Sequence, residues 1–359
     1  MKFAHFSHVW NKPGMTPAGR YAELWRELKL CDELGFDFAF AVEHHFSPHE
    51  SWMPSPAIYT AGAAAHTKRM RIGPMGYVVP LYDPLRIVEE VAALDNVLDG
   101  RLEVGLVSGI RADYFTPYKA DFENRRALTA EAVDLLKTAF ATPGKFSFKG
   151  PHHSYDEVSL SVRPVQAPCP PLWIESRDPP TLKMLAREGI HTGYLFFMPH
   201  EEVVERYKVY LKDWASAGHP SKPNISYWTL VYVDETDEIA RERARPNVLH
   251  NFTTVMGFGD VGGISTSKLA EVFAKRGEHG AAAIAANLTN PDYLMDNDLV
   301  FVGSAKTVAE KVRKASNAGM FNTLLCEFNF GYLPEESVRQ SISRFAKEVI
   351  PALRQHSPY

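Results

Sequence analysis

The stretch FDFAFAVEHHFSPHE, residues 36–50, begins as an alternating apolar run and ends in an acid and two adjacent imidazoles, Glu43, His44 and His45. Alternation with a period of two places the phenylalanines on one face of a strand. On this count His44 continues the phenylalanine side, whereas Glu43 and His45 point the other way. Parallel sheets and barrels hold their functional sites at the carboxyl ends of strands, so these residues predict a site there. A solvated loop start is the alternative, but other strands also end in titratable groups.

The composition is that of a globular protein without a strong charge bias. Of the 359 residues, 45% are hydrophobic and 23% are charged, which suits one large α/β domain or two ordinary ones. The 39 Lys and Arg residues against 43 Asp and Glu residues give a net charge of −4. This balance offers no general attraction to nucleic acid or to an anionic membrane, and we expect neither as a partner.

The cysteines and the N-terminus bear on the compartment. Cys31, Cys169 and Cys326 are far apart and odd in number, so they form neither a disulfide framework nor a zinc-ligand spacing. The N-terminus MKFAHFSHVW lacks a signal-peptide pattern, and no apolar run approaches the ~20 residues of a membrane-spanning helix. The sequence therefore predicts a cytoplasmic protein.

Strand-like and helix-like segments alternate along the chain. Eight runs rich in aromatic or β-branched residues are expected to be strands: KFAHFSHV (2–9), FDFAFAVEHH (36–45), RMRIGPMGYVV (69–79), RLEVGLVSGI (101–110), PPLWIES (170–176), HTGYLFF (191–197), SYWTLVYV (226–233) and FNTLLCEF (321–328). The helical patterns between them carry end signals, with Asp83 and Ser304 at starts and Gly35 and Gly319 at ends.

This alternation implies βαβ units and a parallel sheet. Eight such units predict a closed (β/α)8 TIM barrel, which takes ~250 residues plus insertions. An open doubly wound sheet is the second possibility, disfavoured because no G-x-G-x-x-G motif follows the first strand. The surplus length falls in an insertion at about 111–170, with a hairpin-like patch, and in a Gly- and Ala-rich segment at about 257–290, which we interpret as a mobile lid.

The residues that end the predicted strands are the candidates for the site. They are Glu43, His44, His45, Met75, Gly76, Tyr77, Ser108, Gly109, Ile110, Arg111, Glu175, Ser176, Arg177, Phe196, Phe197, Glu327, Phe328 and Asn329. An aromatic pocket with few carboxylates suits a flat, largely apolar ring that carries a phosphate. Gly76 and Gly109 lack a Cβ, which would let the backbone approach such a ring closely.

A phosphate is expected near Ser176. Its hydroxyl, Arg177 and free backbone N–H groups at the following helix start could bind one. Ordinary N-capping is the alternative for Ser176, and a solvated surface position is the alternative for Arg111 and Arg177.

Two other chemistries fit less well. A retaining glycosidase could use Glu43, Glu175 and Glu327, but sugar-stacking tryptophans beside them are not evident. A metal hydrolase could use histidines at 5, 8, 44 and 45, but HFSH lacks the H-x-H spacing by which alternate strand residues share one metal. No G-x-S-x-G or G-x-x-x-x-G-K-[ST] motif is present.

The chain resembles the bacterial luciferase-like flavin monooxygenases nearly end to end. The resemblance rests on AVEHHF (41–46), IGPMGYVVPLYDPLRIVEEVAALDNVLDGRLEVGLVSG (72–109), PPLWIES (170–176) and GYLPEESVRQSISRFAKEVIPAL (331–353). It implies a single (β/α)8 domain over residues 1–359 that binds reduced FMN. It also implies that the reduced flavin reacts with dioxygen and that the resulting peroxyflavin oxygenates an apolar or aromatic small molecule.

The resemblance assigns roles to several strand-end residues. The family's catalytic histidine falls on His44, where it would do acid–base work suited to an imidazole near pH 7. His45 and Glu43 would orient it. A non-proline cis peptide beneath the flavin ring falls on Met75-Gly76.

The phosphate site of the family falls on Glu175-Ser176 and the following helix start. Light-emitting members carry a phosphate-binding arginine where this chain has Ser108, next to Gly109. Arg111 or Arg177 would therefore have to substitute.

The resemblance also implies partners. Because the chain shows no dinucleotide motif, a separate NAD(P)H-dependent reductase is expected to deliver reduced FMN. The helices expected at 54–66 and 83–98 would form a homodimer interface. An aromatic substrate pocket is expected from Phe6, Trp10, Phe46, Trp52, Phe196, Phe197, Tyr227 and Trp228, with core packing as the alternative for each. The rival functions are deazaflavin-dependent hydride transfer on the same barrel and a non-catalytic flavin-binding subunit.

Overall fold

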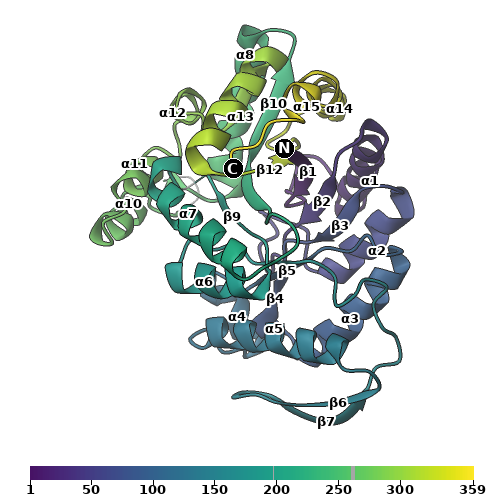
Figure 1. Cartoon of the computed structure of the whole chain (residues 1–359). Coiled ribbons are helices and arrows are strands. Elements are labelled where there is room, and N and C mark those ends of the chain that lie inside the picture. The colour runs from purple at the N-terminus through teal and green to yellow at the C-terminus, as the bar shows by residue number, and fades with distance from the viewer. Residues whose placement is uncertain (197, 260–262) are drawn as a thin grey trace.

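Parallel strands build the centre of the protein, whose computed structural model describes residues 1–196, 198–259 and 263–359 (Figure 1). One sheet runs in the order β11-β10-β12-β1-β2-β3, with β9 also paired to β10, and a second runs β4-β5-β8. The strands are β1 (Lys2–Ser7), β2 (Phe38–Ala41), β3 (Arg71–Pro74), β4 (Tyr77–Val78), β5 (Val104–Val107), β8 (Leu172–Trp173), β9 (Thr192–Leu195), β10 (Ile225–Asp234), β11 (Phe301–Ser304) and β12 (Thr323–Glu327).

Backbone pairing joins the two sheets into a ring. Ile72 of β3 pairs in parallel with Leu102, just before β5, and Trp173 of β8 pairs in parallel with His191, just before β9. β3 and β4 lie on either side of Met75 and serve as one barrel strand. Each of the eight predicted runs thus supplies one strand of a (β/α)8 barrel. The predicted barrel is confirmed, and the open doubly wound alternative is wrong.

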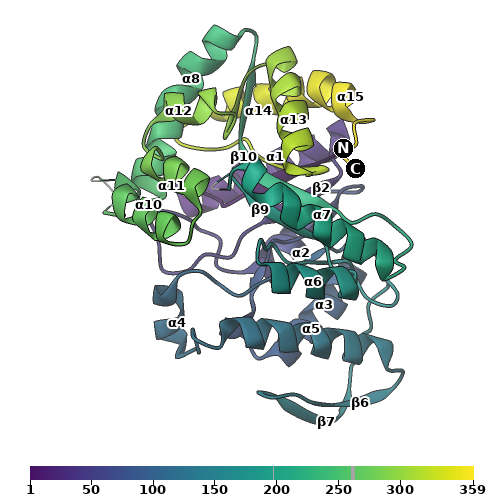
Figure 2. The same ribbon diagram turned by 60° about the vertical axis from the view of Figure 1, so that its left-hand side comes forward.

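Helices surround the ring, as the two views in Figures 1 and 2 show. They are α1 (Pro17–Leu34), α2 (Pro56–His66), α3 (Pro84–Val97), α4 (Ala112–Tyr118), α5 (Arg125–Ala141), α6 (Pro179–Glu188), α7 (His200–Ser216), α8 (Asp237–His250), α10 (Thr266–Lys275), α11 (His279–Ala286), α12 (Pro291–Asp296), α13 (Ala305–Gly319), α14 (Glu335–Arg344) and α15 (Ile350–Leu353), with 3-10 or π turns η1 (Val79–Leu81), η2 (Asn251–Val255) and η3 (Phe345–Val349).

The helix ends follow the signals in the sequence. Asp83 caps α3 by accepting a hydrogen bond from the Leu85 N–H, and Ser304 caps α13. Gly35 ends α1 in the left-handed conformation, with a φ of 84°.

Two features lie outside the ring. The predicted hairpin is present as antiparallel β6 (Lys145–Lys149) and β7 (Ser154–Ser159), which project from the barrel in Figure 1. β11 was not predicted. It pairs with the distal half of β10, from Val231 to Asp234, beyond the part of β10 that belongs to the ring.

The barrel interior is packed with aromatic rings. Phe38 and Phe40 of β2 meet Trp173 of β8, with ring centres 5.9 and 5.5 Å apart. Phe38 and Phe40 therefore share the inner face of β2, in agreement with the predicted alternation, whereas Phe36, before the strand, packs on Phe345 of η3. Within the described residues, no helix combines the length and the apolar character that crossing a membrane requires.

Candidate active site

The strand-end residues gather at one mouth of the barrel, because parallel strands share a direction. His8 follows β1, Glu43 to His45 follow β2, Met75 and Gly76 lie between β3 and β4, Ser108 and Gly109 follow β5, Glu175 to Arg177 follow β8, Phe196 follows β9, and Glu327 ends β12. Their contacts divide them into three groups. One surrounds the loop after β2, another the start of α6, and a third joins β1 to β12.

Glu43 and His45 form a buried pair, on the same side of the chain as predicted. His45 Nε2 lies 2.7 Å from Glu43 Oε1, which also accepts a hydrogen bond from the Tyr82 hydroxyl at 2.7 Å. Glu43 Oε2 accepts a third hydrogen bond, from the Val78 N–H at 2.6 Å. A carboxylate with three donors is held in place, so this arrangement suits a positioning role for Glu43.

His44 is the more accessible of the two imidazoles. Its side chain is 19% exposed, against 5% for His45. Its Nδ1 lies 3.2 Å from Glu50 Oε1, and its backbone N–H donates to the Met53 carbonyl. Burial raises the pKa of Glu50, but the hydrogen bond and charge of His44 and the charge of Arg111 outweigh this effect and lower it. An ionised carboxylate therefore lies beside the histidine.

Arg111 belongs to this same group. Its guanidinium contacts Glu50 at 2.7 Å and Asp113 at 2.6 Å, and it lies over the Tyr114 ring at 4.7 Å. Through Glu50 it is connected to His44. It is therefore not a solvated surface arginine, and its role toward a phosphate stays a prediction.

The peptide between Met75 and Gly76 is cis, as the resemblance implied. A Cβ on Gly76 would lie 2.2 Å from the Gly105 carbonyl carbon, so glycine is required here by the neighbouring strand. Gly109 has a φ of +76°, and a Cβ there would lie 2.9 Å from the Phe115 ring. Protein packing thus accounts for both glycines, and their predicted closeness to a cofactor ring stays a prediction. Ser108, just before Gly109, is half-buried.

The start of α6 corrects one expectation. Free backbone N–H groups were predicted there, but Pro179 and Pro180 have none and the Thr181 N–H already donates to Asp178 at 3.1 Å. The Asp178 N–H in turn donates to Ser176 Oγ at 3.1 Å. The start of α6 therefore has few free N–H groups with which to bind an anion. The hydrogen-bond donors that remain are the Ser176 hydroxyl and the neighbouring arginines.

Arg177 lies among charges of both signs. Burial lowers the pKa of Arg177, and Arg206 and Arg276 lower it further against the opposing charges of Glu278 and Glu202. Its Nη2 lies 3.4 Å from Glu278, and its guanidinium lies over Phe273 at 5.5 Å. Neighbouring cations destabilise one another's charged form, and a bound anion stabilises it. A phosphate bound by Ser176 and Arg177 stays a prediction.

Glu175 and Glu327 are buried carboxyls with unusual proton affinity. Burial raises the pKa of Glu175 to about 7, against a hydrogen bond from Ser226. Burial also raises the pKa of Glu327 to about 8, against hydrogen bonds from the His8 N–H and the Trp228 indole. Carboxyls of this kind are common at functional sites.

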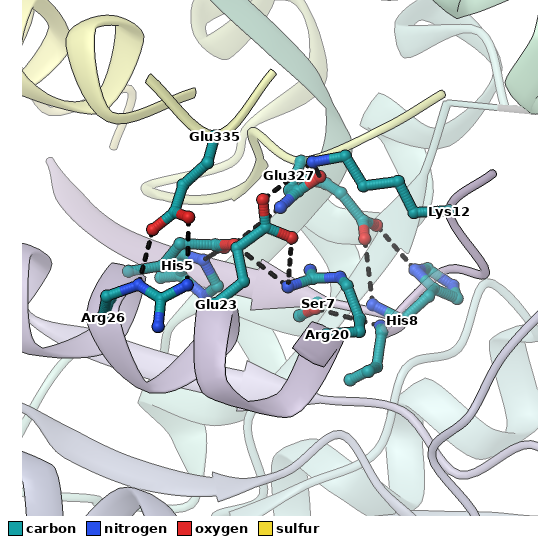
Figure 3. Close-up of polar contacts among 12 residues, drawn as sticks. His5, Ser7, His8, Lys12, Arg20, Glu23, Arg26, Glu327 and Glu335 are labelled. Atoms are coloured by element: carbon teal, nitrogen blue, oxygen red, sulfur yellow. Dashed lines mark hydrogen bonds and ion pairs between the residues drawn. The ribbon is translucent and has the colours of Figure 1, made fainter. Parts of the chain in front are cut away.

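The sequence interpretation missed the pairing of His8 with Glu327. His8 Nδ1 lies 2.6 Å from Glu327 Oε2, and Figure 3 shows how the two residues approach from β1 and β12. The two are 319 residues apart, so local patterns could not reveal the contact. The available signal was that both end strands that are neighbours in a barrel.

A buried charge network supports this side of the barrel (Figure 3). On α1, Arg20 contacts Glu27 at 3.1 Å and Glu23 at 3.4 Å. His5 Nε2 lies 2.9 Å from Glu27, and Lys12 contacts Glu23 at 2.7 Å. The network fixes α1 against β1.

The predicted aromatic pocket divides into distinct places. Phe6, Trp10 and Trp228 surround His8, with ring centres 5.3, 3.9 and 4.8 Å from it. Phe196 packs on Trp228, whereas Tyr227 packs on Phe321 and His200, away from this group. Phe46 is exposed, Trp52 is half-buried, and Phe197 lies outside the described residues.

The rival chemistries gain no support from these contacts. No group of three or more His, Cys, Asp or Glu side chains within the described ranges could hold a metal ion. Glu43 already accepts three hydrogen bonds, which leaves it poorly suited to act as a glycosidase acid or nucleophile.

Comparison with known proteins identifies relatives over the full length. A protein of Sinorhizobium fredii, y4wF, is 27% identical over 341 residues, which cover 93% of this chain and 92% of that one. The oxygenase component of a flavin-dependent trigonelline monooxygenase from Acinetobacter baylyi is 23% identical over 361 residues, covering 98% and 95%.

Solved structures share the fold. Monooxygenase RslO1 from Streptomyces bottropensis superposes with a TM-score of 0.80 at 23% identity, covering 98% of this chain and 99% of that one. The oxygenating constituent of 3,6-diketocamphane monooxygenase from Pseudomonas putida, solved with FMN, gives 0.76 at 20% identity, covering 98% of each chain. An F420-dependent secondary alcohol dehydrogenase gives 0.71 at 18% identity, covering 99% of each.

The family comparison gives the assignment. The model of the family described as luciferase-like monooxygenase matches residues 1–321, which include the predicted site residues from Glu43 to Phe197. The family inferred from the motifs at 41–46 and 72–109 is thus confirmed. The chain belongs to the luciferase-like monooxygenases and is an oxygenating enzyme of that family.

Proposed function

We propose that this protein is the oxygenase component of a two-component monooxygenase that uses reduced FMN and dioxygen to oxygenate an apolar or aromatic small molecule. The observation that carries the proposal is the environment of His44. It is a partly exposed imidazole at the barrel mouth, next to the ionised Glu50 and braced by the Glu43–His45 pair. Such an imidazole can act as a general acid or base.

The chain's residues divide the work between binding and proton transfer. Ser176 and Arg177 bind the phosphate, within the arginine group that favours an anion. Glu175, half-buried beside them with its pKa raised to about 7, carries only part of a negative charge at neutral pH. His44 exchanges the proton, and Arg111 holds Glu50 in place. Reduced FMN, when bound, supplies the electrons for oxygen activation.

The segment at about 257–290 acts as the lid. Its described part, which excludes residues 260–262, contacts the phosphate side of the mouth. Glu278 pairs with Arg177, and the Gly280 N–H donates to Glu202 on α7 at 2.5 Å. Closure there excludes water from the reaction.

The partners follow from the same assignment. A separate NAD(P)H-dependent reductase supplies the flavin, as the oxygenase-component name of the Acinetobacter relative suggests. The protein forms a homodimer through α2 and α3, which expose apolar side chains such as Ile58, at 66%, and Val97, at 59%. The three cysteines are free, in agreement with a cytoplasmic location.

Deazaflavin-dependent hydride transfer is the second candidate, favoured by the structural similarity to an F420-dependent dehydrogenase. Parallel anaerobic titrations of the protein with reduced FMN and reduced F420, followed by oxygen-electrode measurements, separate the two. We expect reduced FMN to bind at least about tenfold more tightly, and the loaded protein to consume oxygen when air is admitted. Preferential binding of F420 without oxygen consumption would overturn the proposal.

A further inference from the structure

The His8–Glu327 pair lies at the mouth, with the His8 ring centre 5.3 Å from that of His44, and the proposed function assigns it no role. Glu327 Oε1 accepts a hydrogen bond from the His8 N–H at 2.9 Å, and Oε2 lies 2.6 Å from His8 Nδ1. The Trp228 indole N–H donates to Oε2 at 3.1 Å. Both side chains are held rigidly, since Glu327 is 1% exposed and His8 stacks on Trp10 at 3.9 Å.

The proton of this pair resides on the carboxyl. Burial raises the pKa of Glu327 to about 8, and burial followed by the charge of His44 holds the pKa of His8 well below its ordinary value. At neutral pH the Glu327 hydroxyl therefore donates to His8 Nδ1, and the neutral ring carries its own proton on Nε2. A histidine tautomer is set by the hydrogen bond of its other nitrogen.

Two donors are left without acceptors beside the pair. His8 Nε2 makes no hydrogen bond within the described part of the chain, and the ring keeps 9% exposure. The Trp10 indole N–H is buried and also lacks an acceptor among the described residues. Phe6, Trp10 and Trp228 surround the ring, and the His44 ring lies 5.3 Å from it. The Trp10 indole N–H is thus a buried polar group without a partner in the described chain, which is rare and calls for an explanation, and the partly exposed His8 ring lies next to it.

We propose that His8 is a specificity residue that donates a hydrogen bond from Nε2 to an acceptor atom, such as a carbonyl oxygen, on the aromatic substrate. This inference rests on the proposed function and adds the substrate's chemistry: an apolar ring system with an acceptor group. Glu327 is a positioning residue that keeps Nε2 protonated. Trp10 supplies the second donor and the stacking surface.

A second histidine–glutamate pair in the chain, His153 and Glu131, has the opposite arrangement of protons. His153 Nδ1 lies 2.9 Å from Glu131 Oε1, but this carboxylate also accepts hydrogen bonds from the His152 and His153 N–H groups. Burial raises the pKa of Glu131, but these hydrogen bonds outweigh it and lower the pKa. An ionised Glu131 requires a proton on His153 Nδ1, opposite to His8.

The charged groups that face the pair come from several elements. His44 and Glu50 face it from the loop after β2, His5 from β1, and Arg20 from α1. None of them makes a hydrogen bond to Glu327 within the described chain. Loss of the Glu327 proton as the pH rises through about 8 should therefore move the His8 proton from Nε2 to Nδ1.

The tautomer can be measured directly by long-range 1H–15N NMR of the full chain labelled at histidine, with His8→Phe to assign the signal. We expect His8 protonated on Nε2 at pH 7 and a shift toward Nδ1 above pH about 8. Glu327→Gln should abolish this shift, and the matched control Glu131→Gln should leave the His8 signal unchanged. A His8 protonated on Nδ1 at pH 7 would overturn the inference.

Recognition is tested with two isosteric probes, 2-acetylnaphthalene and 2-isopropenylnaphthalene, which differ in carrying C=O or C=CH2. Quenching of tryptophan fluorescence gives their affinities. Wild type should favour the ketone by about tenfold, His8→Phe should lose that preference, and His8→Asn, which keeps a donor, should retain part of it. Equal affinities in wild type, or no binding of either probe, would refute recognition by His8. Neither experiment needs flavin, so failure of this inference can be distinguished from failure of the proposed function.

Discussion

Three glutamates of this barrel show how environment sets proton affinity. Burial raises the pKa of Glu175 to about 7 and that of Glu327 to about 8. Glu27 is equally buried, but Arg20, His5 and Asn329 outweigh the burial and lower its pKa to about 2. A nearby cation and hydrogen-bond donors thus decide which carboxyls are ionised. The two glutamates with raised pKa values lie at the mouth, and the ionised Glu27 anchors α1.

Replacing Glu327 with Gln should flatten the dependence of stability on pH. The folded-state pKa is raised above the unfolded value of 4.5, so the folded chain binds more protons. Protonated Glu327 makes its full contribution to the free energy of unfolding below pH 4.5, and this contribution is lost as the pH rises to about 8. The loss is at most about 1.4 kcal/mol per pH unit. Chemical denaturation of both proteins from pH 5 to 8 measures it.

Chemical denaturation of Glu175→Gln over the same pH range should show a smaller change in the pH dependence of stability, because the pKa of Glu175 is raised less than that of Glu327. Parallel pH profiles for wild type and Glu327→Gln would contradict the protonated state of Glu327.

At the scale of elements, the β8 exit and α6 form the phosphate side of the mouth. Arg177→Ala should weaken binding of FMN by about tenfold or more, because a charge-assisted hydrogen bond to phosphate is lost. Arg187→Ala, at the far end of α6 and 74% exposed, is the matched control and should bind normally. Flavin fluorescence titration measures both. Equal affinities for the two variants would place the phosphate elsewhere.

Much of the element order follows from the sequence, because each barrel strand carries its own apolar run with turn residues on either side. β11 escaped prediction, since it pairs outside the ring, with the distal half of β10. The wrong expectation of free N–H groups at the start of α6 could have been avoided, since the sequence shows Pro179 and Pro180 there and proline has no backbone N–H. The His8–Glu327 contact and the link of Arg111 to His44 depend on tertiary packing, which one sequence does not encode locally.

At the scale of the whole molecule, α2 and α3 leave an apolar face uncovered. Ile58→Glu should convert the homodimer into a monomer, since burying an unpaired charge costs several kcal/mol. Ile110→Glu is the control, because Ile110 is 91% exposed and lies after β5. Sedimentation velocity gives the oligomeric state. A monomeric wild type, or a dimer retained in Ile58→Glu, would exclude this interface.

The measurement that tests the central claim most directly is stopped-flow absorbance of anaerobic protein with reduced FMN, mixed with oxygenated buffer. We predict that flavin reoxidation is slower than for free FMN and becomes faster again in His44→Ala, by a factor on the order of 100. His49→Ala, an exposed histidine of the same loop, should behave like wild type. Free-flavin kinetics in wild type would contradict the monooxygenase assignment, and His44→Ala kinetics equal to wild type would point to a non-catalytic flavin-binding subunit.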